Sequence, residues 1–139
     1  MLKGIDPLLG PDLLHHLRAM GHGDVLAVVD RNYPAATRGG RVVRLDGVDL
    51  ETAVRAVLSV LPLDTFVEPA VLRMGAPDGL QPVHAPVDAA IDEVCGRSVA
   101  KGELARFDFY DQASRAYAAV ATGETLPYGC YLFTKGVLT

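Results

Sequence analysis

The sequence Asp24-Val25-Leu26-Ala27-Val28-Val29-Asp30 determines the fold class that we predict for this 139-residue chain. It places an unbroken run of aliphatic residues between two acids, with no alternation of apolar and polar side chains. A strand with one face in water alternates, whereas a strand of a parallel sheet is covered by helices on both faces and is apolar throughout. The run therefore predicts a central strand of a parallel sheet in an α/β fold.

Helical and extended patterns alternate on both sides of this run. We expect helices over residues 11–20, 49–61, 86–95 and 109–120, and further strands over residues 41–45, 70–74, 106–108 and 128–134. Pro11 suits the first turn of a helix, Asp108 suits an N-cap, and the glycines and prolines of residues 75–86 predict a loop. The alternation predicts one domain over residues 1–139, a layered αβα architecture with a largely parallel central sheet.

The composition limits the partners and the compartment. A formal net charge of −4 argues against binding to nucleic acid or to an anionic membrane surface, which require basic patches. No apolar run approaches the roughly 18 residues of a membrane span, and residues 1–10 lack the pattern of a signal peptide. Cys95 and Cys130 have no CxxC spacing and predict free thiols, so we expect a cytoplasmic protein.

His22 is the first candidate for chemistry, because it stands between Gly21 and Gly23. The flanking glycines leave the imidazole open to a ligand, and an imidazole gives or takes a proton near neutral pH. The same residues also fit an ordinary loop at the end of a helix, which the residues alone favour. A zinc site made of His16, His22 and Asp24 is disfavoured, because no metal-ligand spacing supports it.

Three further clusters could bind a polar ligand, and each also has an ordinary structural explanation. Asp30 ends the buried strand, where it could accept hydrogen bonds from hydroxyl groups, but acids are also common in turns. Arg106 could donate to neighbouring hydroxyls, or it could pair with Asp108 at the surface. Tyr128 could bind a hydroxyl beside the small Gly129, or it could pack in the core.

Other kinds of site find little support in the sequence. No glycine-rich phosphate loop of the dinucleotide or P-loop type occurs, which argues against a nucleotide cofactor. Cys130 has no assignable histidine and acid partners, so we interpret it as a buried structural thiol rather than a nucleophile.

Taken together, the clusters resemble the RbsD/FucU family of D-ribose pyranases and L-fucose mutarotases over nearly the whole chain. The most specific segments are residues 20–24, 30–34, 106–110, 122–124 and 128–129. The resemblance implies that His22 is the catalytic histidine and that Asp30, Arg106, Tyr128, Gly129 and Cys130 bind substrate. It also places Arg106 where the fucose branch has arginine and the ribose branch typically has histidine, so the chain is nearer the fucose branch.

Two residues depart from the pattern of the family. Cys130 stands where asparagine is common, so a side-chain amide that would bind a sugar hydroxyl is lost, although a backbone contact at this position would survive. Arg31 follows the aspartate in place of a small residue and would alter the rim of the pocket. The reaction is therefore better supported than the identity of the sugar.

The resemblance implies a mutarotase that interconverts the α and β anomers of L-fucose or a related aldose by acid/base ring opening, with no metal and no cofactor. Two alternatives stay open. One is a D-ribose pyranase, which interconverts pyranose and furanose rings. The other is a sugar-binding protein without catalysis, which Cys130 would favour.

The separation of His22 and Asp30 along the chain indicates how the site is assembled. Eight residues of extended chain span up to roughly 26 Å at about 3.3 Å each, which is too far for one monosaccharide to bridge. The family forms ring-like oligomers, some of them decamers. We therefore expect a homo-oligomer whose sites are completed between subunits.

Overall fold

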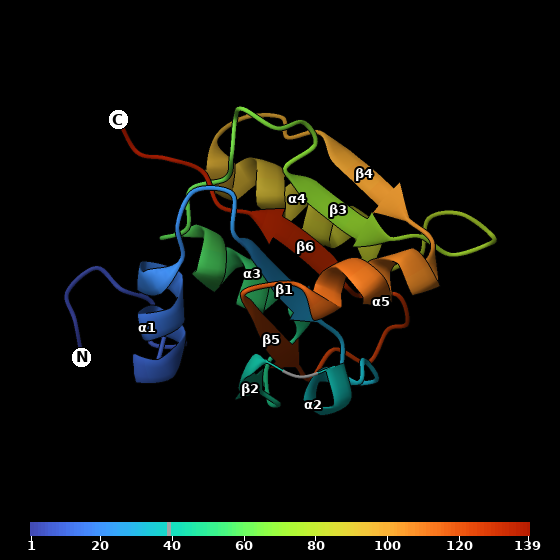
Figure 1. Cartoon of the computed structure of the whole chain (residues 1–139), viewed down its shortest axis with the longest axis horizontal. Coiled ribbons are helices and arrows are strands. Elements are labelled where there is room, and N and C mark those ends of the chain that lie inside the picture. Colours follow the sequence, from blue (N-terminus) through green and yellow to red (C-terminus); the bar gives the residue numbers. More distant parts are fainter. Residues whose placement is uncertain (39) are drawn as a thin grey trace.

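The centre of the structure is a six-stranded sheet in the order β2-β5-β1-β6-β3-β4 (Figure 1). The structure is a computed structural model and describes residues 1–38 and 40–139. Its strands are β1 (Val25–Val29), β2 (Arg41–Leu45), β3 (Val71–Met74), β4 (Lys101–Leu104), β5 (Ala118–Thr122) and β6 (Tyr131–Thr134). Its helices are α1 (Pro11–Ala19), α2 (Ala35–Arg38), α3 (Leu50–Leu58), α4 (His84–Cys95) and α5 (Arg106–Ser114).

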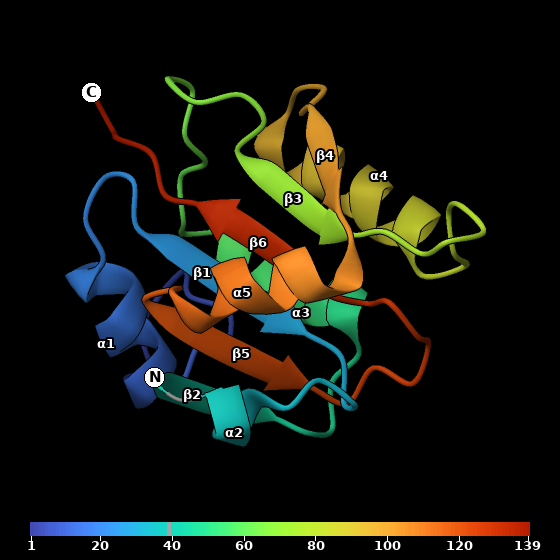
Figure 2. The same cartoon turned by 45° about the vertical axis from the view of Figure 1, so that its right-hand side comes forward.

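Strand β1 lies inside the sheet and is buried on both faces, as its sequence predicts. Leu26 and Val28 belong to one core, together with residues of α1, α3 and α4. Ala27 and Val29 belong to a second core, together with residues of α2 and α5. Figures 1 and 2 show α3 and α4 behind the sheet and α5 in front of it. The predicted αβα layering is therefore confirmed.

The sheet is largely parallel, and β6 is the exception. Strands β1 and β2 each run parallel to β5, and β3 runs parallel to β4, whereas β6 is antiparallel to both of its neighbours, β1 and β3. A parallel connection needs a crossover of about a dozen residues or more, but only residues 123–130 separate β5 from β6. The chain therefore reverses direction, and the beginning of β6 lies beside the end of β1.

The expectation that residues 106–108 are extended is wrong. Ala105 is the N-cap of α5 and Arg106 is its first residue, so Asp108 lies in the first turn and is not the cap. The strand that does precede this helix, β4, has the sequence Lys-Gly-Glu-Leu at the edge of the sheet. An edge strand tolerates polar side chains, so it lacks the apolar pattern that marks β1.

The helix expected to reach residue 120 ends earlier, at Ser114, and Ala118–Thr122 forms β5. Phe109 and Ala113 are buried on the helix, as expected, but Val120 is buried within the sheet. An alanine-rich apolar segment fits a helix face and a doubly covered strand equally well. Pairing with β1 and β2 decides for the strand.

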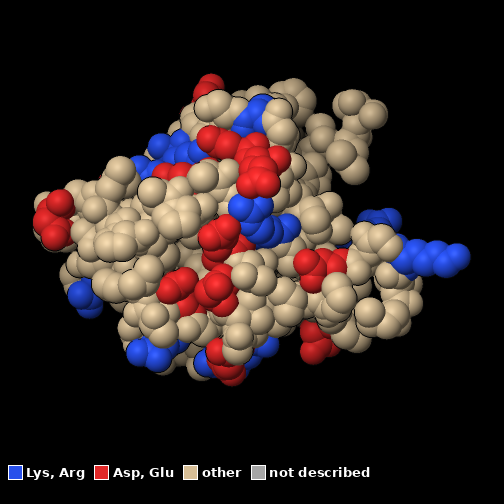
Figure 3. Space-filling model, turned by 180° about the vertical axis from the view of Figure 1, so that it is seen from behind, with Lys and Arg blue, Asp and Glu red and all other residues tan. Residues whose placement is uncertain are grey.

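The face of the molecule that carries α3 and α4 shows acidic and basic side chains interspersed among uncharged ones (Figure 3). Within the described residues, no helix combines the length and the apolar character that a membrane crossing requires.

Candidate functional site

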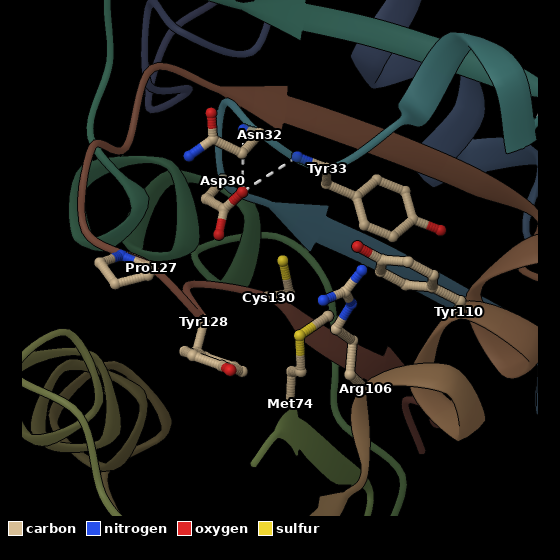
Figure 4. A pocket seen from close by; sticks show the side chains of 9 residues that line it. All are labelled: Asp30, Asn32, Tyr33, Met74, Arg106, Tyr110, Pro127, Tyr128 and Cys130. Atoms are coloured by element: carbon tan, nitrogen blue, oxygen red, sulfur yellow. Dashed lines mark hydrogen bonds between the residues drawn. The ribbon is translucent and has the colours of Figure 1, made fainter. Parts of the chain in front are cut away.

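A pocket opens at the carboxyl end of β1, beside the beginning of β6 (Figure 4). Its volume is about 230 Å³. The nine residues that line it supply a carboxylate, an amide, a guanidinium and three phenols: Asp30, Asn32, Tyr33, Met74, Arg106, Tyr110, Pro127, Tyr128 and Cys130. The fold thus brings together four residues that the sequence analysis named, although about a hundred positions separate the first from the last: Asp30, Arg106, Tyr128 and Cys130. Such a mixture of donors and acceptors suits a small polyhydroxylated ligand.

Asp30 organises one wall of the pocket through its carboxylate. Oδ1 accepts hydrogen bonds from the backbone amides of Asn32 and Tyr33, at 2.9 and 3.0 Å. Oδ2 accepts one from the amide of Gly129, at 3.2 Å. An ionised carboxylate has about four acceptor positions, so this buried group still has room for one hydroxyl donor from a ligand.

Tyr128 lines another wall of the pocket, and Gly129 follows it in the chain. Tyr128 has a φ of 63°, the only positive φ of a non-glycine residue in the described chain. Gly129 must be small, because a Cβ there would lie 3.1 Å from Glu124 and 3.3 Å from Leu50 and Val83. Because Gly129 has no side chain, its backbone fits between these residues and its amide reaches Asp30.

Arg106 reaches the pocket from the first position of α5. Its guanidinium carbon lies 5.5 Å from the centre of the Tyr110 ring and 5.0 Å from that of Phe107. The pairing with Asp108 that the sequence left open is not formed, and no ion pair of Arg106 occurs among the described residues. The donors of this exposed guanidinium are therefore free to bind a ligand.

Cys130 closes the floor of the pocket with a buried thiol. Burial, together with the neighbouring Asp30 carboxylate, raises the pKa of this thiol well above its ordinary value. A thiol that stays protonated is a poor nucleophile. Cys130 is therefore buried and forms no disulfide, as the sequence predicted, and its role as a structural thiol stays a prediction.

His22 is not part of this pocket. It precedes the opposite end of β1, in the loop between α1 and β1. Its Nε2 lies 3.0 Å from Oδ1 of Asp64, and its ring packs against Phe66 with 5.3 Å between ring centres. The His22 side chain is 45% exposed, whereas that of Asp64 is 1% exposed. The buried Asp64 thus holds the imidazole of His22 at Nε2, while nearly half of the His22 side chain stays exposed.

The loop of His22 is itself fixed by hydrogen bonds. The backbone of Gly23 donates to the carbonyl of Lys135, and the backbone of Gly21 donates to the side chain of Asp24. The Lys135 ammonium donates to the carbonyl of Leu17 in α1 and to that of Met20, the C-cap of this helix. The two glycines therefore belong to an ordered turn that presents the imidazole.

Residues 3–138 match the RbsD / FucU transport protein family. The chain belongs to this family. It is 42% identical to the fucose mutarotase of Homo sapiens over 99% of this chain and 94% of the relative, and 39% identical to the L-fucose mutarotase of Haemophilus influenzae (strain 86-028NP) over 99% and 97%. The crystal structure of the fucose mutarotase of Streptococcus pneumoniae in complex with L-fucose has a TM-score of 0.93 to it. That protein is 34% identical, and the match covers 99% of this chain and 100% of the other.

Asp64 is the functional candidate of this RbsD/FucU chain that the sequence did not reveal. Burial raises the pKa of its carboxyl, but hydrogen bonds from the Phe66 amide and from His22 outweigh that effect, so the pKa lies below its ordinary value. Its Oδ2 is buried and has no partner within the described chain. Because Asp64 and His22 are 42 positions apart, no local spacing could have predicted the pair.

Within residues 1–38 and 40–139, no three side chains of histidine, cysteine, aspartate or glutamate are arranged to hold a metal ion. His16, which the sequence placed beside His22 as a conceivable ligand, instead lies edge-to-face against Tyr117, with 6.1 Å between ring centres.

Proposed function

We propose that this chain is an aldose mutarotase that interconverts the α and β anomers of L-fucose or a related aldose, with His22 as the proton-transfer residue. Relatives from human and Haemophilus that match it over almost their whole length are named fucose mutarotases. The observation that carries the proposal is the pocket in which Asp30, Arg106 and Tyr128 converge. Its acceptor, guanidinium and phenol fit the hydroxyl groups and ring oxygen of a monosaccharide.

Mutarotation opens the sugar ring to the aldehyde and closes it again on either face. The anomeric hydroxyl must lose a proton while the ring oxygen gains one. His22 performs this transfer, since an imidazole both gives and takes protons near neutral pH. Asp64 holds the ring in place and stabilises the imidazolium that forms, because it is an ionised acid in hydrogen-bond contact with Nε2. A placed acid/base group of this kind accelerates a reaction by about 10²–10⁴-fold.

The catalytic histidine and the pocket come from different subunits in this proposal. His22 and Asp30 flank the two ends of β1, which is extended and paired on both sides, so the chain does not fold back to join them. Eight extended residues span up to roughly 26 Å, further than a monosaccharide reaches. The active species is therefore a homo-oligomer in which the half-exposed imidazole of one subunit faces the pocket of the next.

Exchange spectroscopy by NMR tests the function directly. The α and β signals of L-fucose, D-ribose and D-galactose are saturated in turn, and the transfer rate is measured with and without protein. We expect accelerated anomer exchange that His22→Ala reduces by at least about a hundredfold. His15→Gln, a change to an exposed histidine of α1, is the matched control and should keep the wild-type rate. A wild-type rate in His22→Ala would refute the assignment.

A sugar-binding protein without catalysis is the second candidate, and Cys130 is the observation that favours it. The thiol occupies the pocket where the family commonly has asparagine, so one amide contact to the sugar is missing. Binding of L-fucose without any acceleration of anomer exchange would support this candidate. Faster exchange between pyranose and furanose rings of D-ribose than between the anomers of L-fucose would instead indicate a ribose pyranase.

A further inference from the structure

His84 is a fully buried histidine that the mechanism does not use. It is the first residue of α4, and both of its ring nitrogens are engaged. Nδ1 accepts a hydrogen bond from the backbone amide of Gln81, at 3.0 Å. Nε2 lies 3.1 Å from the backbone carbonyl of Tyr128. A nitrogen that accepts from an N–H carries no hydrogen, so the ring hydrogen is on Nε2, which donates to Tyr128.

This hydrogen bond falls on the peptide unit that forms one wall of the pocket. The carbonyl of Tyr128 accepts from His84, and the amide of the next residue, Gly129, donates to Oδ2 of Asp30 at 3.2 Å. The peptide plane between Tyr128 and Gly129 is thus held from both sides. Asp30 holds the amide end from β1, and His84 holds the carbonyl end from α4.

Tyr128 needs such support because of its backbone conformation. Its φ of 63° is in the left-handed region, which a residue with a side chain adopts at a cost unless its surroundings hold it there. The short bond from the Cys130 amide to the same carbonyl, at 2.9 Å, only tightens the turn locally. His84 ties the carbonyl of this turn to α4, 44 positions away, as Asp30 ties the neighbouring amide to β1.

We propose that His84 is a positioning residue of the sugar pocket: it holds the Tyr128 carbonyl and thereby directs the Tyr128 phenol toward the ligand. The proposal rests on the proposed function, since it assumes that Tyr128 binds the sugar. His84 touches no substrate, so it acts on sugar binding through Tyr128 and leaves the proton transfer by His22 unchanged.

The same histidine also connects the pocket to the loop of residues 75–83. The Gln81 amide that binds Nδ1 belongs to a turn in which the Gln81 side chain donates to Asp78 and to the carbonyl of Gly79. This loop borders a second cavity of about 460 Å³, which Tyr128 and Arg106 also line. A ligand group or neighbouring subunit that displaces the loop therefore changes the position of Tyr128 through His84.

Two amide substitutions separate the two hydrogen bonds of His84. In His84→Gln, the side-chain amide nitrogen takes the place of Nε2 and keeps a donor for the Tyr128 carbonyl. In His84→Asn, the amide oxygen takes the place of Nδ1 and keeps the acceptor for Gln81, but the donor to Tyr128 is lost. Both variants replace the ring by a smaller amide, so a purely structural role would affect them alike.

Saturation kinetics of anomer exchange with L-fucose test the proposal. We expect His84→Asn to raise KM about tenfold, the loss of one placed hydrogen bond, with kcat within about twofold. His84→Gln should restore most of the wild-type KM, and Tyr128→Phe should raise KM as His84→Asn does. Equal KM values for the two His84 variants, or a fall in kcat without a rise in KM, would overturn the proposal. If wild-type protein accelerates no exchange, the proposed function fails instead, and the same comparison is made on the Kd of L-fucose.

A measurement on the unmodified protein covers the case in which a variant does not fold. The chain has four histidines, so the ring nitrogens of His84 can be assigned by ¹⁵N NMR. We expect the neutral ring with hydrogen on Nε2, and a shift of its Nε2 resonance that saturates with L-fucose. A ring with hydrogen on Nδ1, or a resonance that does not respond to bound sugar, would contradict the proposal.

Discussion

Cys130 places a small, uncharged side chain in a pocket that is otherwise rich in polar groups. Its thiol is buried beside the Asp30 carboxylate, and its raised pKa keeps it neutral. A neutral thiol is a weak hydrogen-bond donor. In the proposed function, the polar contacts to a sugar therefore come from the other polar side chains of the pocket, among them Asp30, Arg106 and Tyr128.

The buried thiol of Cys130 and the buried phenol of Tyr131 should make the protein less stable at alkaline pH. Burial raises the pKa of the Cys130 thiol, and burial with the Asp88 carboxylate raises that of the Tyr131 phenol. Both pKa values are higher in the folded state, so their contribution to stability is complete below the unfolded values of about 8.5 and 10 and is lost as pH rises above them. We expect the urea midpoint, measured under reducing conditions, to fall between about pH 8 and 11.

Cys130→Ala provides the control for the thiol part of this effect. Without the thiol, the midpoint should fall less between about pH 8 and 9.5, whereas the later fall that belongs to Tyr131 should persist. Parallel curves for wild type and variant over that first interval would show that the Cys130 proton does not contribute.

At the scale of elements, the sequence was most informative where one element is buried on both faces. Strand β1 could be predicted because a short, unbroken aliphatic run is typical of a strand buried on both faces. The core face predicted for α5 is confirmed at Phe109 and Ala113. The start of α5 was placed too late because Asp108 suits an N-cap, whereas Ala105, which occupies that position, has no capping side chain. Segment 118–122 was missed because its alanines suit a helix and a strand alike.

Some residues of the candidate site could be predicted from the sequence and others could not. Asp30, Arg106 and Tyr128 could be named from motifs that each lie in one short segment, and the pocket contains all three. Asp64 and His84 could not, because each matters only through a partner more than forty positions away. Long-range pairings of this kind are made by the sheet and its crossovers, and no local pattern records them.

The turn that leads from β5 to the pocket depends on a glycine. A Cβ at Gly123 would lie 2.1 Å from the carbonyl oxygen of Asp46, so the turn and the loop before α3 could not both stay in place. We expect Gly123→Ala to lower the free energy of unfolding by about 2 kcal/mol or more in urea titrations. Gly47→Ala in the same loop meets no atom within 4 Å and should change it by less than about 0.5 kcal/mol. Equal losses would mean that the close approach does not matter.

For the whole molecule, the central fact is that β1 separates the imidazole from the pocket. The strand is paired on both sides and buried on both faces, so it cannot bend to bring His22 to Arg106 within one subunit. His22 is half-exposed and Arg106 is exposed, as the proposed shared site requires. If each site is shared between two subunits, variants impaired in different halves of the site can complement each other, which is impossible if one subunit holds a complete site.

Two impaired variants should restore each other when they assemble together. In an equal mixture of His22→Ala and Arg106→Ala subunits, about a quarter of the shared sites combine an intact His22 with an intact Arg106. Co-expression with two different tags, purification over both and NMR exchange at low L-fucose concentration would detect this activity. His22→Ala with Asp64→Asn is the matched control, because both residues lie on the same side of the site and no pairing restores them. Sites complete within one subunit would leave both mixtures no more active than the average of their two variants.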